Sequence, residues 1–143
     1  MNTTTLPRSN TAPVWHYVLL AVGDALVLLA FAVIGRASHS LTAENPLVAT
    51  LLTASPFLAT WAVVAPPMFV YGRGAQALNS PGRWLAHTAL TWLVAGPLGL
   101  ALRLALFRRP FILTFALVTM ATVWLMMLVW RGIYWLVVKR LAA

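Results

Sequence analysis

Asp24 is one of only two acidic residues in this chain, and it lies inside an apolar run, Val14 to Ile34, that is long enough to cross a bilayer. A carboxylate at that depth is costly unless it is paired or performs a function. We expect Arg103 to be its partner, because Arg103 lies about one turn inside the membrane face that carries Arg36 and its side chain leans toward the midplane. At ~1.5 Å of rise per residue, the Cα atoms of the pair should differ by roughly 8 Å along the bilayer normal.

This expected pair has two functional interpretations. In the first, it is a structural clamp that neutralises both charges and fixes the first helix against the third. In the second, it is a proton- or ion-responsive site at which Asp24 exchanges Arg103 for a proton or substrate during transport. Asp24 could instead meet a different partner, a backbone group or another subunit.

The three histidines allow a cofactor hypothesis. His16 and His87 lie near the tail-side starts of their helices at similar depth, so a bis-histidine haem is geometrically conceivable, although a histidine near the membrane interface needs no cofactor to explain it. His39 follows Arg36 in a connection, where it could help to bind an anion, sense pH or simply be solvated. Two acids, three scattered histidines and no cysteine do not form a metal-ligand set. We therefore predict no cofactor and no metal site.

Four long apolar segments must position these residues. Hydrophobic residues make up 62% of the 143-residue chain and charged residues only 8%, which indicates an integral membrane protein. Short connections predict an all-α, polytopic, antiparallel bundle of four transmembrane helices. We expect a flexible polar tail over 1–13, one membrane domain over 14–138 and a basic end over 139–143. The expected helices are 14–34, 47–70, 84–106 and 111–130, the last with an interfacial extension to about 138.

The basic residues predict how the bundle is oriented. The net charge is +8, but the basic residues lie mostly at the ends of apolar runs, so we expect no nucleic-acid partner. More of them fall on the side of the N-terminal tail than on the opposite side, which predicts a multi-pass plasma-membrane protein with both termini cytoplasmic. The tail side has Arg8, Arg73, Arg83, Arg131, Lys139 and Arg140, and the other side has Arg36, Arg108 and Arg109. We interpret Arg131 as the start of a stretch that emerges through the headgroups.

Prolines and tryptophans inside the helices are also candidates for a binding site. Pro56, Pro66, Pro67 and Pro97 interrupt helical hydrogen bonding, and broken helices are where transporters bind substrate, although prolines are also common in ordinary membrane helices. Three tryptophans lie near helix centres, where an indole N–H needs a partner. These tryptophans are Trp61, Trp92 and Trp124. They could line a quinone, pigment or lipid site, or pack against neighbouring helices.

Short motifs spread over residues 14 to about 132 resemble the domain-of-unknown-function family DUF3054, which comprises small four-helix membrane proteins. The matching motifs are Gly23-Asp24, Gly35-Arg36 with Ser38-His39, Pro56-Phe57-Leu58, Gly99 with Leu102-Arg103, and Phe115, Val118 and Trp130-Arg131. The resemblance implies that Asp24, Arg36, His39, Arg103 and Arg131 belong to the family pattern. It implies no activity, substrate or cofactor.

The sequence favours an accessory or structural subunit of a membrane complex rather than an enzyme. The alternatives are a small transporter or channel component that uses Asp24, and a redox protein that binds haem or quinone. We expect its partners to be the lipid bilayer and either further copies of the chain or other membrane subunits.

Overall fold

The computed structural model describes residues 14–38, 45–71, 80–108 and 110–141. These residues form four helices, α1 (Val14–Ser38), α2 (Pro46–Val64), α4 (Pro81–Phe107) and α5 (Leu113–Leu141), and no strand. All four are long and apolar enough to cross a membrane. The all-α, four-helix fold is therefore confirmed, and the tail over 1–13 and His39 lie outside the described residues.

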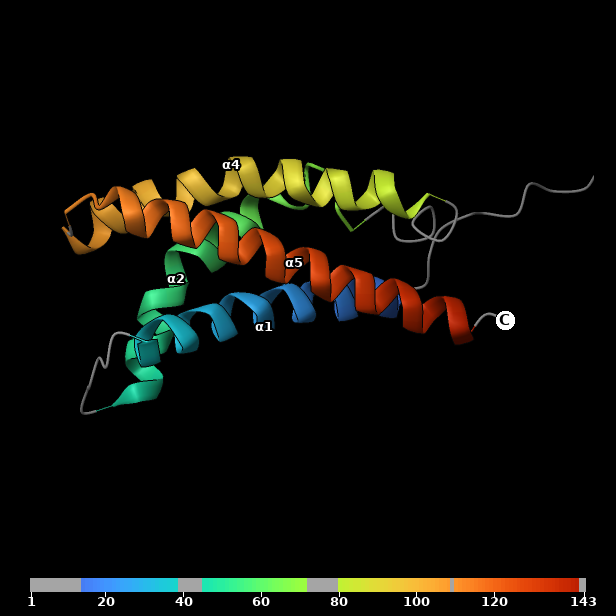
Figure 1. The fold of residues 1–143 in the computed structure, drawn as a ribbon, viewed down its shortest axis with the longest axis horizontal. Coiled ribbons are helices and arrows are strands. Elements are labelled where there is room, and N and C mark those ends of the chain that lie inside the picture. Colours follow the sequence, from blue (N-terminus) through green and yellow to red (C-terminus); the bar gives the residue numbers. More distant parts are fainter. Residues whose placement is uncertain (1–13, 39–44, 72–79, 109, 142–143) are drawn as a thin grey trace, which may run out of the picture.

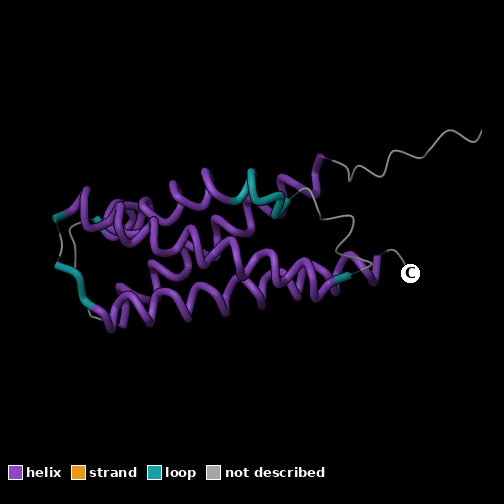
Figure 2. Tube along the Cα trace, turned by 90° about the horizontal axis from the view of Figure 1, so that it is seen from above, coloured by secondary structure: helices purple, strands orange, loops and turns teal. Residues whose placement is uncertain are grey.

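The four helices are arranged as a ring in which each one packs mainly against two neighbours. The packed pairs are α1 with α2, α2 with α4, α4 with α5, and α5 with α1. Figures 1 and 2 show α5 running back beside α1 in the opposite direction, so that the end of α5 lies near the start of α1. The first and last helices thus close the bundle.

The helix ends differ from the expected ones for local reasons. Asn45 caps α2 by accepting a hydrogen bond from the Val48 N–H at 3.1 Å, and Pro46 occupies the first turn, where its missing N–H costs nothing. Regular helix in α2 stops at Val64, six residues before the expected end, because Pro66 and Pro67 cannot donate backbone hydrogen bonds. By contrast, α5 continues to Leu141, so the expected basic end starts inside this helix.

Aromatic side chains fill the centre of the bundle. Trp92 and Phe57 are buried with their ring centroids 6.2 Å apart, and Phe31 and Trp61 each pack against this pair at the same centroid distance. Pro56 does not open α2 here, because the Leu52 carbonyl that it leaves without a backbone donor accepts a hydrogen bond from the Ser55 hydroxyl at 3.0 Å. The break expected at Pro56 is thus closed locally.

Candidate functional site

The candidate site is an ion pair between the first and last helices. Arg131 Nη2 lies 2.6 Å from Asp24 Oδ2, and both side chains are 0% exposed. Asp24 lies ten residues after the start of α1 and Arg131 ten residues before the end of α5. Because those two helix ends lie at the same end of the bundle, both residues reach a depth of about 15 Å at ~1.5 Å per residue.

The expected pairing of Asp24 with Arg103 is wrong. Helix α1 continues four residues past Ile34, so Asp24 lies fourteen residues before its end, whereas Arg103 lies only four residues before the end of α4. The ten-residue difference corresponds to about 15 Å along the axis, roughly twice the expected separation. Arg103 instead stacks on Phe115 of α5, with its Cζ 4.3 Å from the ring centroid.

The carboxylate of Asp24 has a second hydrogen-bond donor from α2. Trp61 Nε1 donates to Asp24 Oδ2 at 3.1 Å, and the same N–H approaches the Tyr71 hydroxyl at 2.9 Å. The indole N–H of Trp61 therefore has the partner that we expected it to need. Hydrogen bonds to an ionised acceptor are stronger than neutral ones, so Trp61 holds α2 against the pair.

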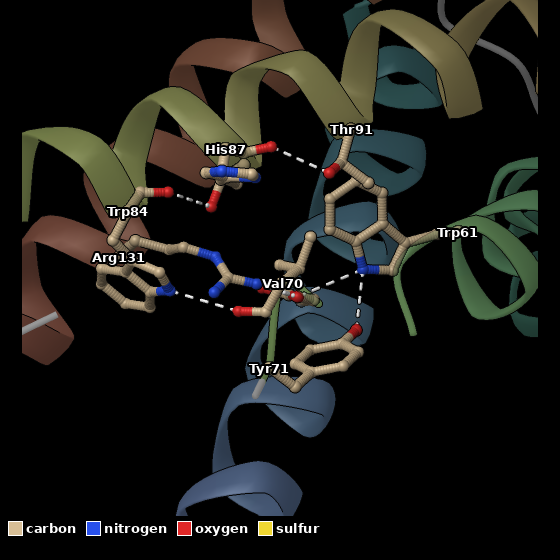
Figure 3. Close-up of polar contacts among 9 residues, drawn as sticks. Trp61, Val70, Tyr71, Trp84, His87, Thr91 and Arg131 are labelled. Carbon is tan, nitrogen blue, oxygen red and sulfur yellow. Dashed lines mark hydrogen bonds and ion pairs between the residues drawn. The ribbon is translucent and has the colours of Figure 1, made fainter. Parts of the chain in front are cut away.

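Aromatic rings surround the guanidinium of Arg131. Its Cζ lies 4.9 Å from the Trp84 ring centroid and 5.7 Å from that of Tyr71, within the range of cation–π attraction. Trp84 Nε1 donates to the Val70 carbonyl at 3.2 Å, which connects α4 to the turn after α2. Figure 3 shows these contacts around Arg131. All four helices thus contribute to the site.

Three polar atoms of the ion pair have no hydrogen-bond partner among the described residues. Asp24 Oδ1 and the Nε and Nη1 atoms of Arg131 are buried, and none of the three bonds to a polar group in the described part of the chain. A buried polar atom without a partner is destabilising, and such atoms are concentrated where a protein binds or switches. The pair is neutral overall, yet it could still engage a proton or a small polar group.

The prediction that Arg131 starts a segment emerging through the lipid headgroups is wrong, because Arg131 is buried inside the bundle. Met127, Arg131 and Tyr134 are all buried, and their spacing of four and three residues puts them on one face of α5. Val123 and Thr119 continue this face toward the helix start. This spacing was the signal that could have identified Arg131 as an inward-facing residue. Lys139 and Arg140 are exposed, and Lys139 stacks on Trp135.

The two haem candidates lie on diagonally related helices, α1 and α4. The Nδ1 atom of His16 is hydrogen-bonded to the Tyr134 hydroxyl, and the His87 carbonyl accepts from the Thr91 hydroxyl at 2.8 Å (Figure 3). Within 14–38, 45–71, 80–108 and 110–141, no group of three or more His, Cys, Asp or Glu residues could hold a metal ion. Of the other central tryptophans, Trp92 donates to the Met120 carbonyl at 3.0 Å, while Trp124 is 43% exposed.

Four of the five candidate residues lie in two separate places. Asp24 and Arg131 form the central pair, while Arg36 and Arg103 line a cavity at the opposite end of the bundle, and His39 is outside the described residues. The structure thus groups these side chains differently from the sequence-based prediction, and their functional importance stays a prediction.

Comparison with known proteins gives one match. Residues 21–134 match the model of a family described as a protein of unknown function, DUF3054. No curated protein and no solved structure matches the chain. The matched range includes both members of the central pair and most of every helix.

Proposed function

Because this chain belongs to the DUF3054 family, a family of unknown function, we propose its role from the site itself: it is an accessory or structural subunit of a membrane complex. The family match starts inside α1 and ends inside α5, which makes the helical bundle the part that the family shares. Any common role of the family therefore belongs to the bundle.

One observation carries this proposal: the Asp24–Arg131 pair is fully buried and joins the helices that close the ring. A charged pair in this position serves as a clamp, because separating α1 from α5 would leave two uncompensated charges among apolar side chains. A substrate could reach Asp24 only after the side chains that bury it, Trp61 among them, had moved away. This arrangement supports a stable scaffold better than a catalytic or transport centre.

The proposal includes an orientation with both termini in the cytoplasm of a plasma-membrane protein. Arg131 is paired inside the bundle, so it no longer counts among the charges that set topology. The tail side still has five basic residues, against three on the opposite side. The five are Arg8, Arg73, Arg83, Lys139 and Arg140, and the three are Arg36, Arg108 and Arg109.

The subunit proposal is tested by the mass of the intact assembly. The tagged full chain is extracted in a mild detergent and, separately, in polymer-bounded native membrane discs. Native mass spectrometry of both preparations should show the same assembly, with a mass greater than that of a single chain. The additional mass can be further copies of the chain or another membrane protein. A single chain alone in both preparations would contradict the proposal.

A small transporter or channel component is the second candidate, favoured by the three polar atoms of the pair that bond to no described residue. This candidate predicts that liposomes containing the protein dissipate an imposed proton or sodium gradient faster than empty liposomes. The Asp24→Asn variant should then insert and purify normally but lose the flux. Equal leak rates for wild-type and empty liposomes would reject this candidate and leave the clamp.

A further inference from the structure

A second polar region lies at the end of the bundle where α1 and α4 finish and α2 and α5 begin. It contains two cavities of about 270 Å³ and about 210 Å³, which share Arg36, Thr53 and Arg103 in their walls. The larger cavity is also lined by Ser38 and Thr119. Two guanidinium groups and three hydroxyl groups thus line these cavities, together with apolar side chains such as Phe31, Phe115 and Val118 in the larger one.

The Thr119 side chain carries a polar group, unpaired among the described residues, beside the larger cavity. Threonines in these helices commonly donate to the carbonyl four residues earlier, as Thr53 does to Ala49 at 2.8 Å. Thr119 is only 1% exposed, yet its hydroxyl makes no such bond and none to any other described residue. Thr119 is one of the residues that line the larger cavity, so this hydroxyl is buried in the cavity wall.

Arg103 is held in a defined position for binding. Its guanidinium stacks on the Phe115 ring, with Cζ 4.3 Å from the ring centroid, and this contact uses the face of the guanidinium rather than its N–H edge. Arg36 and Arg103 also make other interactions within the protein, but each guanidinium has five N–H donors, enough to bind an additional acceptor. Each guanidinium can donate two parallel N–H hydrogen bonds, an arrangement that matches the oxygens of a phosphate group.

We propose that this cavity binds a phosphate-class anion at the membrane face, either the phosphodiester of an anionic lipid or a free phosphate. Arg36 lies two residues and Arg103 four residues before their helix ends, about 3–6 Å inside those ends at ~1.5 Å per residue. At this depth the guanidiniums reach the layer of lipid phosphates. The site lies at the other end of the bundle from the start of α1 and does not depend on the subunit proposal.

The test uses the purified full-length protein in a non-ionic detergent and two probes. Inorganic phosphate is titrated by calorimetry, and short-chain phosphatidylglycerol is compared with phosphatidylcholine by native mass spectrometry. Arg36→Gln and Arg103→Gln should each weaken binding by about tenfold or more, because each removes charge-assisted hydrogen bonds. Arg83→Gln is the matched control: it removes the same charge from α4 at the opposite membrane face and should leave the affinity unchanged.

Two further variants keep the test decisive if a glutamine variant does not fold. Arg103→Lys retains the charge but loses the two-pronged geometry, so it should bind more weakly than wild type. Thr119→Val should weaken binding a few-fold while the melting temperature stays within a few degrees of wild type.

The two probes identify the source of the anion. Binding of inorganic phosphate assigns the site to a free anion, and selective retention of phosphatidylglycerol assigns it to a lipid headgroup. The proposal is overturned if wild type binds inorganic phosphate no better than chloride and also retains the two lipids equally. It is also overturned if Arg83→Gln weakens binding as much as Arg103→Gln does.

Discussion

At the scale of single residues, Asp24 and Arg131 depend on each other. Each is fully buried, and each would be an isolated charge among apolar helices if the other were removed. Trp61 adds a hydrogen bond to the carboxylate, and Trp84 adds a ring contact to the guanidinium. The pair is thereby fixed from α2 and α4 as well as from its own helices.

A double-mutant cycle should reveal this dependence. Asp24→Asn and Arg131→Gln should each lower the unfolding free energy by about 3–5 kcal/mol, because each leaves a buried charge without its partner. The double variant should lose clearly less than the sum of the two single losses. Thermal unfolding in detergent, followed by circular dichroism, measures all four proteins.

The control cycle combines Asp24→Asn with Arg103→Gln, the pair that the sequence had suggested. Its losses should simply add, since Arg103 stacks on Phe115 and is separated in depth from Asp24. Additive losses in the Asp24–Arg131 cycle would show that these two charges do not interact.

Gly23, the residue before Asp24, allows α1 and α5 to approach closely. A methyl group added at Gly23 would lie 2.0 Å from Cζ2 of Trp130, a rigid ring that cannot easily yield. Gly23→Ala should therefore destabilise the bundle by about 1–3 kcal/mol. Gly132→Ala is the matched control, because nothing lies within 4 Å of that position, and it should stabilise α5 by roughly 0.5–1 kcal/mol. Equal melting temperatures for the two variants would contradict this contact.

At the scale of elements, the turn after α2 places Val70 and Tyr71 beside the Asp24–Arg131 pair. The Val70 N–H donates to the Ala65 carbonyl at 3.3 Å, and the Phe69 N–H donates to the Pro66 carbonyl at 3.0 Å. This is the hydrogen-bond pattern of a Schellman motif, which requires a left-handed residue, usually glycine, at the position of Phe69. Phe69 has φ 54°, so this turn is strained.

Substitutions at Phe69 should change stability in opposite directions. The Phe69 side chain is 64% exposed, so Phe69→Gly removes little packing. The substitution relieves the strain of the left-handed backbone, which is about 1–2 kcal/mol. The greater freedom of glycine in the unfolded chain offsets part of this gain in stability. We expect a net gain of roughly 0.5–1 kcal/mol. Phe69→Val should lower the melting temperature, because a β-branched residue tolerates positive φ poorly. A reversal of this order in thermal unfolding would contradict the proposed strain.

At the scale of the whole molecule, the antiparallel ring creates two different ends. One end joins the start of α1 to the end of α5, and the other contains the cavity lined by Arg36 and Arg103. The ion pair lies between them and links the first helix to the last. With the proposed orientation, the cavity lined by Arg36 and Arg103 faces away from the cytoplasm.

Cysteine labelling can determine this orientation, because the natural chain contains no cysteine that would react. Ser38 and Ser80 are both exposed and lie at opposite ends of the bundle. In intact cells a membrane-impermeant maleimide should label Ser38→Cys, and it should label Ser80→Cys only after permeabilisation. The opposite labelling pattern would place the termini outside the cytoplasm.

The number of helices could be predicted from the sequence alone, and so could the need of Asp24 for a partner inside the membrane. Segments of about 20 apolar residues must form helices in a bilayer, since no other open structure satisfies the backbone there. A carboxylate inside such a segment is costly enough to require an explanation without any knowledge of the fold. These conclusions need only the length of the apolar runs and the type of one residue.

Only the folded bundle identifies Arg131 as the partner of Asp24. A pairing across helices depends on the depth and rotation of each helix, and small shifts in the helix ends moved the Asp24–Arg103 separation from roughly 8 Å to about 15 Å. Rotation is only weakly marked in the sequence, by polar residues such as Thr119 and Arg131 on one face of α5, because membrane helices are apolar on their lipid-facing sides as well as their buried ones. It is set by close contacts such as that of Gly23 with Trp130, which bring Asp24 and Arg131 face to face.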